Sequence, residues 1–254
     1  MKDRNGLKAI VYKVAAATDR GQRMNAMIAP MYQEKLVEME KLVEALVPLS
    51  NEITQNAIEG EWELIYSSVE LFRSSPFFLA IEKALNDKSK SDLFFKLHLL
   101  QVGSFGLSTV GRVGQYLNFN KEEMISTFDT TIFGLTTIPI LGWFKLLPTF
   151  GGRVITLAKD LQLKDNKLSM ELDKTKISEV PGLRKIPFLD SILMGRWYPV
   201  NTIWKLLPWN KENPSCEITV IYVDEDLRII RDMHGGLFIY IRPSIPLLDL
   251  RKLK

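Results

Sequence analysis

The sequence is poor in the residues that build disulfides and metal centres. Among 254 residues it holds one cysteine, Cys216, and two histidines, His98 and His234. One cysteine excludes an intramolecular disulfide and every multi-cysteine zinc motif, and it fits a reducing compartment. Two histidines exclude a histidine-rich metal centre and leave only two bases for a Ser–His–acid triad. We therefore expect no metal and no cofactor.

Long apolar runs, an excess of one charge and common nucleotide-binding motifs are also missing. The longest uncharged runs, 99–111 and 130–144, are shorter than the roughly 18 to 20 residues that cross a bilayer as a helix. The 33 basic and 30 acidic residues give a net charge of +3 without a basic stripe, so we expect no nucleic-acid partner. P-loop, G-x-S-x-G and G-x-G-x-x-G motifs are absent. No transit peptide is visible at the start, so we expect either that the sequence begins after processing or that its targeting signal lies outside it.

Two helices are expected at the start of the chain. Apolar residues recur at helical spacing between residues 7 and 17, and again between 36 and 46. Gly21 and Pro48 mark the two ends. The simplest role for these apolar stripes is packing on a core, and the alternative for the second is a partner helix.

After Gly60 the apolar pattern changes to that of short strands. Strands are expected at 62–67, 92–102, 123–133, 153–163, 167–175, 217–223, 227–231 and 237–242. Short turns at 164–166, 224–226 and 234–236 make the neighbouring strands antiparallel. Because strands and helices do not alternate, the economical architecture is an antiparallel barrel, whose closure removes exposed edges.

Gly60 and Trp62 open the first strand, and Arg242 closes the last. In a closed meander these two strands are neighbours, so we expect Arg242 to lie over the Trp62 ring, a cation–π contact of about 0.5–2 kcal/mol. The G-x-W start resembles that of lipocalins, whose barrels hold one apolar ligand. We therefore predict a mainly β chain of the α+β class, in which a helical segment at 1–55 packs on a lipocalin-like antiparallel β-barrel at 56–254. Two insertions rich in Trp and Pro are expected at about 134–152 and 181–214.

Two longer motifs lie at the two ends of this barrel segment. The first is GEWELIYSS at 60–68 followed by FRSSPFF at 72–78, and the second is YVDEDLRIIR at 222–231 followed by GGLFIYIR at 235–242. Both resemble the plastid lipid-associated proteins, also called the fibrillin or plastoglobulin family, and the resemblance spans about residues 8–243. It implies a lipocalin-like barrel in plastids or cyanobacteria, at chloroplast plastoglobules or thylakoids, with a role in lipid or isoprenoid storage, transport or metabolism. One member type of the family acts by binding a prenyl-diphosphate synthase.

The motif residues are expected to form the fold and a lipid pocket. In a lipocalin-like barrel the segment after the first strand crosses the mouth, where Phe77 and Phe78 would contact a lipid tail at about 25 cal/mol per Å² buried, or simply fill the barrel. Arg73 would meet a polar head group or cap a loop. The predicted lipid-binding residues are Trp62, Tyr66, Arg73, Phe77, Phe78, Phe238 and Arg242.

A repeated apolar segment favours contact with a membrane surface. WFKLLP at 143–148 recurs in altered form as IWKLLP at 203–208. Tryptophan beside lysine in a proline-broken apolar segment suits the bilayer interface, where the ring lies at head-group depth and the lysine extends outward. The alternative is that these segments cover the barrel. The predicted membrane-contact residues are Trp143, Lys145, Trp204, Lys205 and Trp209.

Three functions remain open at this point. The leading hypothesis is a non-enzymatic barrel that binds an apolar lipid or prenyl chain and docks peripherally on a lipid droplet or membrane. The second is an adaptor without a ligand cavity, which binds an enzyme of isoprenoid metabolism through the helix at 32–47. The third is a lipid-modifying enzyme, which needs an acid or base deep in the barrel, for which Asp129, His98 and Glu171 are the candidates.

Overall fold

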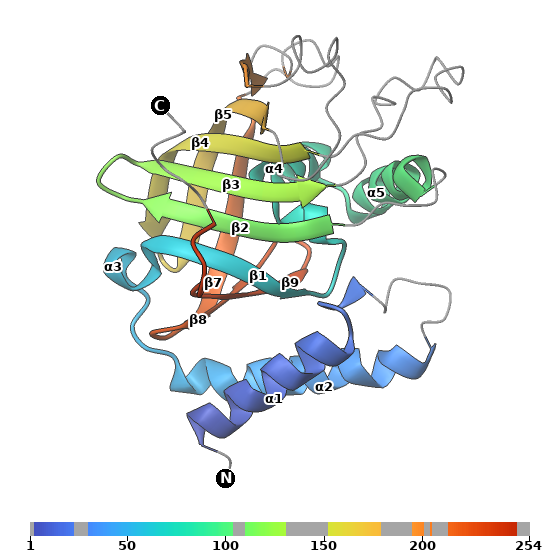
Figure 1. Ribbon diagram of the computed structural model, residues 1–254, viewed down its shortest axis with the longest axis vertical. Coiled ribbons are helices and arrows are strands. Elements are labelled where there is room, and N and C mark those ends of the chain that lie inside the picture. Colours follow the sequence, from blue (N-terminus) through green and yellow to red (C-terminus); the bar gives the residue numbers. More distant parts are fainter. Residues whose placement is uncertain are drawn as a thin grey trace.

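Eight antiparallel strands close into a barrel in this computed structural model, with two helices packed beneath it (Figure 1). The structure describes residues 3–22, 30–103, 110–130, 152–178, 195–200, 204 and 213–247. The barrel strands are β1 (Gly60–Ser67), β2 (Val110–Asn118), β3 (Glu123–Thr130), β4 (Gly152–Lys164), β5 (Lys167–Ser178), β7 (Ser215–Val223), β8 (Leu227–Arg231) and β9 (Leu237–Ile241). Each pairs with the next in this order, and β9 pairs with β1 to complete the circle. The short strand β6 (Trp197–Pro199) pairs with β5 beside the barrel. The predicted α+β class and antiparallel barrel are confirmed.

The two faces of the barrel wall carry two separate apolar clusters. On β9, Phe238 and Tyr240 belong to the cluster inside the barrel, whereas Leu237 and Ile239 belong to the cluster beneath the N-terminal helices. All four side chains are fully buried. This part of the wall is therefore apolar on both faces, which explains why its sequence shows little polar alternation.

Helices α1 (Arg4–Ala17) and α2 (Pro30–Leu46) cover the outer face of this wall (Figure 1). Asp3 begins α1 because its carboxylate accepts a hydrogen bond from the backbone N–H of Gly6 at 2.7 Å. A 3₁₀ turn, η2 (Val47–Leu49), ends α2 at the expected proline. Both predicted helices are confirmed, and their buried apolar residues share one cluster with Leu237 and Ile239 of the wall.

Gly21 brings the end of α1 against β1. Its φ is +84°, and a Cβ at this position would lie 2.0 Å from the carbonyl oxygen of Ser67. The neighbouring Arg20 accepts a backbone hydrogen bond from Ser67 at 3.0 Å. Only glycine allows both the left-handed backbone and this close approach.

The predicted strand at 92–102 is wrong, because this stretch lies in helix α5 (Lys88–Gly103). Asp87 starts the helix by accepting a hydrogen bond from the backbone N–H of Lys90 at 3.1 Å. A continuous apolar run such as LFFKLHLL does not distinguish a strand from a helix, and leucine and lysine favour a helix. The strand that follows the first one is instead β2, which the sequence analysis missed because Gly111 and Gly114 interrupt its apolar pattern.

The two ends of the barrel carry different helices (Figure 1). Helix α3 (Gln55–Ile58) lies where β1 begins, which we call the base. The 3₁₀ turn η3 (Leu71–Ser74) and helices α4 (Pro76–Leu85) and α5 lie at the opposite end, which we call the mouth. No helix among the described residues is both long and apolar enough to cross a membrane.

Candidate functional site

At the base of the barrel, Arg242 lies over the Trp62 ring as predicted. Its guanidinium carbon is 3.7 Å from the ring centroid, and the Trp62 side chain is fully buried. The same guanidinium donates hydrogen bonds to the carbonyl oxygens of Glu59, at 2.6 Å, and Ala57, at 3.1 Å. Gly60 has a φ of +95°, and a Cβ there would lie 2.9 Å from Arg242 Nη1. The G-x-W motif therefore supplies the backbone turn and the space that this contact needs.

A second arginine, Arg228, lies inside the barrel and was missed by the sequence analysis. It alternates on β8 with Leu227 and Ile229, which face the outer helices, and its side chain is fully buried. Its guanidinium carbon lies 5.0 Å from the Trp62 centroid and 4.7 Å from the Tyr240 centroid. The sequence gives one indication of this position, because Arg228 stands between apolar residues in LRIIR at 227–231.

The Arg228 guanidinium has one hydrogen-bond partner among the described residues. Nη2 donates to Gln115 Oε1 at 2.5 Å, whereas Nε and Nη1 have no acceptor. Gln115 in turn donates to the Tyr240 hydroxyl at 3.0 Å and to the Ser74 carbonyl at 3.3 Å. Burial lowers the pKa of Arg228 to about 9, which leaves the group charged at neutral pH. The interior thus holds a fixed cation without a carboxylate partner in the described part of the chain.

Polar side chains continue from Gln115 around the inner wall. In the strand register Gln115 lies opposite Ser126, Ser126 opposite Thr156, and Thr156 opposite Thr175. Met124 and Ala158, which lie two residues from Ser126 and Thr156, belong to the cluster inside the barrel, so alternation places these polar residues on the same face. This polar row crosses β2, β3, β4 and β5 at one level.

At the mouth, Arg73 belongs to a buried ion cluster. Its Nη2 lies 2.7 Å from Glu82 Oε1 and 4.0 Å from Asp232 Oδ2, and its guanidinium covers the Phe95 ring at 4.3 Å. His234 Nε2 lies 4.0 Å from Glu82. Burial, with the charge of Asp232, raises the pKa of Glu82 to about 7. Because Arg73 already pairs with Glu82, its charge is used to hold η3 on α4.

The phenylalanines at the mouth pack on one another and on Trp204. Phe77 makes edge-to-face contacts with Phe78 at 5.3 Å and with Trp204 at 6.3 Å between centroids. Trp204 is 3% exposed and belongs to the cluster inside the barrel. This placement corrects the expectation of an interfacial ring at Trp204, since the apolar surface of that ring is covered by the protein itself. Trp143, Lys145, Lys205 and Trp209 lie outside the described residues.

The two remaining predicted lipid-binding residues lie on opposite faces of the wall. Phe238 is inside the barrel, whereas Tyr66 is buried in the cluster beneath α1 and α2. The pairing of β1 with β9 shifts between Leu64 and Tyr66, and this bulge reverses the alternation that starts at Trp62. The Tyr66 side chain therefore does not line the barrel interior.

The PAP_fibrillin family model matches residues 5–241 of the chain. The chain belongs to this family. The match covers both N-terminal helices and the barrel, and it agrees with the motifs at 60–78 and 222–242. Membership implies association with lipids and with plastids. No curated protein and no solved structure matches the chain.

The residues considered for catalysis do not gather inside the barrel of this fibrillin-family chain. Asp129 pairs with Arg153, whose Nε is 2.6 Å away, and it follows the inward-facing Phe128, so it lies on the outer face. Glu171 lies between Met170 and Leu172 of the inner cluster, so it too faces outward. The side chain of His98 lies outside what is described. Among the described residues, no group of three or more His, Cys, Asp or Glu side chains has the arrangement to hold a metal ion.

Helix α5, which lies at the mouth of the fibrillin barrel (Figure 1), carries an exposed apolar face. Leu93 is 59% exposed, Leu97 is 52% exposed and Phe94 is 36% exposed. The exposed side chains of Lys90 and Lys96 lie beside them on the same helix. The opposite face of α5 is anchored by Phe95, which contacts Phe72 and Phe78. We call Leu93, Phe94, Leu97 and these two lysines the α5 patch.

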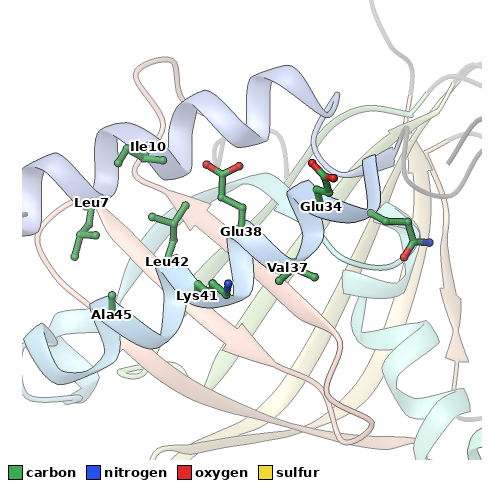
Figure 2. A pocket seen from close by; sticks show the side chains of 9 residues that line it. Leu7, Ile10, Glu34, Val37, Glu38, Lys41, Leu42 and Ala45 are labelled. Atoms are coloured by element: carbon green, nitrogen blue, oxygen red, sulfur yellow. The ribbon is translucent and has the colours of Figure 1, made fainter. Parts of the chain in front are cut away.

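A groove of about 640 Å³ lies between α1 and α2 on the side away from the barrel (Figure 2). Its floor is apolar and includes Leu7, Ile10 and Leu42. Glu34 and Glu38 extend along its rim (Figure 2). Val37, which also lines the groove, is 53% exposed.

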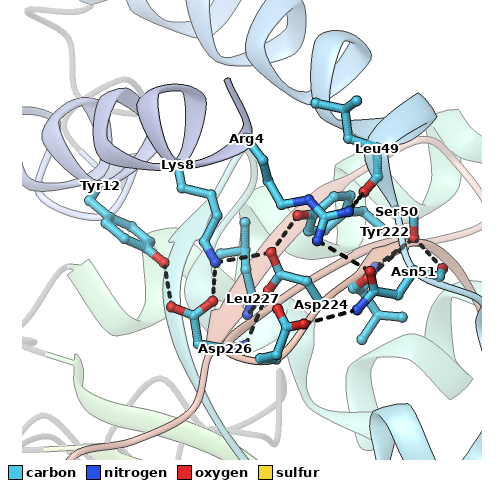
Figure 3. A network of polar contacts seen from close by, with 12 residues as sticks. Arg4, Lys8, Tyr12, Leu49, Ser50, Asn51, Tyr222, Asp224, Asp226 and Leu227 are labelled. Carbon is cyan, nitrogen blue, oxygen red and sulfur yellow. Dashed lines mark hydrogen bonds and ion pairs between the residues drawn. The ribbon is translucent and has the colours of Figure 1, made fainter. Parts of the chain in front are cut away.

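A polar network fixes α1 to the turn between β7 and β8 (Figure 3). Lys8 Nζ donates to Asp224 Oδ2 at 2.9 Å and also pairs with Asp226. The Tyr222 hydroxyl donates to the same Asp224 oxygen at 2.5 Å, and the backbone N–H of Leu227 donates to its other oxygen. Burial opposes ionisation of Asp224, but these hydrogen bonds prevail and hold its pKa at about 2. The acidic stretch at 224–226 is therefore an anchor for the helix.

Proposed function

We propose that the protein is a non-enzymatic lipid-associated protein of chloroplast plastoglobules or thylakoids, which docks peripherally on their surface and binds an apolar lipid or isoprenoid. Membership of the PAP_fibrillin family and the barrel fold support the lipid-associated part of this proposal. The exposed apolar α5 patch at the mouth is the observation that carries the docking part.

The chemistry of the α5 patch suits the surface of a lipid layer. Leu93 and Leu97 are one helical turn apart, so they form a continuous apolar strip on the helix. Each Å² of that strip that leaves water contributes about 25 cal/mol. Lysines beside such a strip keep their charge at head-group depth while their methylene stems follow the apolar surface. Docking through this patch would place the barrel mouth against the lipid.

The test is flotation of the purified protein with vesicles of phosphatidylcholine that contain phosphatidylglycerol. We expect the wild-type protein to float and the double variant Leu93→Ser/Leu97→Ser to stay largely in the dense fraction. The matched control is Val37→Ser/Ile245→Ser, which removes two other exposed apolar side chains, at 53% and 66% exposure, far from α5 in the sequence. Equal flotation of all three proteins would refute docking through α5.

The predicted contact of Trp143, Lys145, Lys205 and Trp209 with a membrane is tested in the same assay. The variant Trp143→Ala/Trp209→Ala is expected to float less well than the wild-type protein if these segments also insert. Unchanged flotation of this variant, together with loss in the α5 variant, would assign docking to α5 alone.

The groove between α1 and α2 favours a second candidate, an adaptor that binds an enzyme of isoprenoid metabolism. An apolar floor lined also by Glu34, Glu38 and Lys41 suits an amphipathic helix with charged flanks. Binding to a purified prenyl-diphosphate synthase, measured for the wild-type chain and for Val37→Asp, tests this role. Loss of binding in the variant would support the adaptor, and flotation should not change.

A further inference from the structure

We propose that Arg228 is the receptor for the anionic head group of an amphiphile that binds inside the barrel. The inference deepens the proposed function and rests on it in one respect, that the ligand is a lipid. The site comprises the Arg228 guanidinium, Gln115 and the rings of Trp62 and Tyr240.

Arg228 has hydrogen-bonding capacity that the described residues leave unmet. A guanidinium carries five N–H donors, and the three on Nε and Nη1 have no acceptor among the described residues. A charged donor buried in this way is costly, and folded proteins rarely leave one without a partner. An acceptor that arrives with a ligand would satisfy these groups.

The positive charge of Arg228 also lacks a counter-ion among the described residues. No carboxylate of the described residues pairs with Arg228, and the nearby charge of Arg242 is of the same sign. A neutral acceptor such as an alcohol or a ketone would supply a hydrogen bond but would leave the positive charge uncompensated. A carboxylate or a phosphate matches both the charge and the planar fork of the guanidinium.

The Arg228 guanidinium is held in place by its neighbours. Gln115 fixes Nη2 and is itself fixed by the Tyr240 hydroxyl and the Ser74 carbonyl. Trp62 and Tyr240 border the guanidinium with their rings, at 5.0 and 4.7 Å. A cation with this degree of positioning loses little freedom when an anion binds.

The surroundings suit an amphiphile better than a free anion. Leu64, Leu117 and Ile230 belong to the same inner cluster, so an apolar chain attached to the head group would contact aliphatic side chains. Met124 and Met170 are also in this cluster, and unbranched methionine side chains can adopt other rotamers to admit a chain. The polar row from Gln115 to Thr175 offers hydroxyl groups at the level of the head group.

The experiment titrates the purified protein, without vesicles, with oleate, with oleyl alcohol, with dodecyl phosphate and with acetate, and counts bound molecules by native mass spectrometry. We expect one oleate per chain, with binding at least about tenfold tighter than for oleyl alcohol, and no saturable binding of acetate. Dodecyl phosphate tests whether a phosphate head also fits. Equal binding of oleate and oleyl alcohol, or no one-to-one complex with either anionic amphiphile, would overturn the proposal.

The variants Arg228→Met and Arg228→Lys assign the binding to this residue. Arg228→Met should lose at least about tenfold in oleate affinity while its unfolding midpoint without ligand stays equal to or rises above that of the wild-type chain, because an unpaired buried charge is removed. Arg228→Lys keeps the charge and should retain part of the affinity. Arg196→Met, which removes an exposed arginine, is the matched control and should bind as the wild type does.

Two results would contradict the assignment. One is a lower unfolding midpoint for Arg228→Met with unchanged oleate affinity, which would show that the arginine only supports the fold. The other is unchanged oleate affinity in Arg228→Lys and Arg228→Met alike. Because docking is measured by flotation and ligand binding in free solution, loss of flotation in the α5 variant leaves this result unaffected, and failure here leaves docking intact.

Discussion

Arg242 and Trp62 join the two ends of the barrel chain at a single contact. The arginine covers the ring at 3.7 Å and also donates to the Glu59 carbonyl, so it fixes the turn that leads into β1. A lysine keeps the charge but cannot reach several carbonyls with a planar fork.

We therefore expect Arg242→Lys to lower the free energy of unfolding by about 1–3 kcal/mol in a urea titration. Arg196→Lys, at an exposed position, should stay within about 0.5 kcal/mol of the wild-type value. If the two variants are equally stable, the contact does not stabilise the base.

Glu82 makes stability depend on pH near neutrality. Burial raises its pKa from 4.5 to about 7, so between these values the folded chain keeps a proton that the unfolded chain has released. The free energy of unfolding should then fall as pH rises from 5 to 7.5, by about 2 kcal/mol. Asp224, whose pKa is lowered to about 2, affects stability only below this window.

Urea unfolding at several pH values checks this prediction. Glu82→Gln should flatten the dependence between pH 5 and 7.5, while Glu44→Gln, at an exposed position of α2, should keep the wild-type slope. A wild-type slope in Glu82→Gln would show that this carboxyl group does not titrate in that range.

At the scale of single residues, the sequence predicted the contact that closure of the barrel creates. It did not predict on which face of the wall some side chains are buried. Closure of a meander brings Arg242 to Trp62, and this could be predicted. Tyr66 was misplaced because a bulge after Leu64 shifts the register, and a bulge has no reliable signature in the residues around it. Arg228 was missed because a charged residue in a short strand is usually on the solvent face.

Among the elements, α1 depends on one buried ion pair with the barrel. Lys8 is 8% exposed and Asp224 is 3% exposed, and the pair links residues 216 positions apart in the sequence. Removing the lysine leaves a buried carboxylate that keeps Tyr222 and backbone N–H groups as donors. The loss should therefore be substantial without being complete.

We expect Lys8→Met to lower the free energy of unfolding by about 1–3 kcal/mol and to speed hydrogen exchange in α1 more than in β2 or β3. Lys13→Met, at an exposed position of the same helix, should change neither. Uniform acceleration of exchange across the barrel would mean that α1 does not open as a separate unit.

The helices show where sequence patterns are informative. The stripes of α1 and α2 have helical spacing and end at Gly21 and Pro48, so both helices were predictable. The apolar residues of α5 show no clear helical period because they lie on two faces of the helix. One face packs on the protein through Phe95, and the other face is exposed. Asp87 as a helix start was the signal that would have distinguished this helix from a strand.

At the scale of the whole molecule, the closed barrel separates an interior cation from an exterior apolar patch. Arg228 lies inside the barrel between the Trp62 ring and Gln115, which reaches the Ser74 carbonyl of η3, and the α5 patch is on a helix at the mouth (Figure 1). Such an arrangement suits a protein that takes up an amphiphile from a lipid surface, because the surface is met at the mouth and the head group is held inside the barrel. The sequence predicted the barrel, but the positions of the interior cation and of the α5 patch required the three-dimensional structure.

The most direct test of this account is native mass spectrometry of the protein purified from its own cells, combined with extraction of its lipids. The account predicts a chain that carries one amphiphile with an anionic head group, and a matching mass in the lipid extract. A bare chain, with an extract no richer in lipid than that of an unrelated protein purified in the same way, would contradict it.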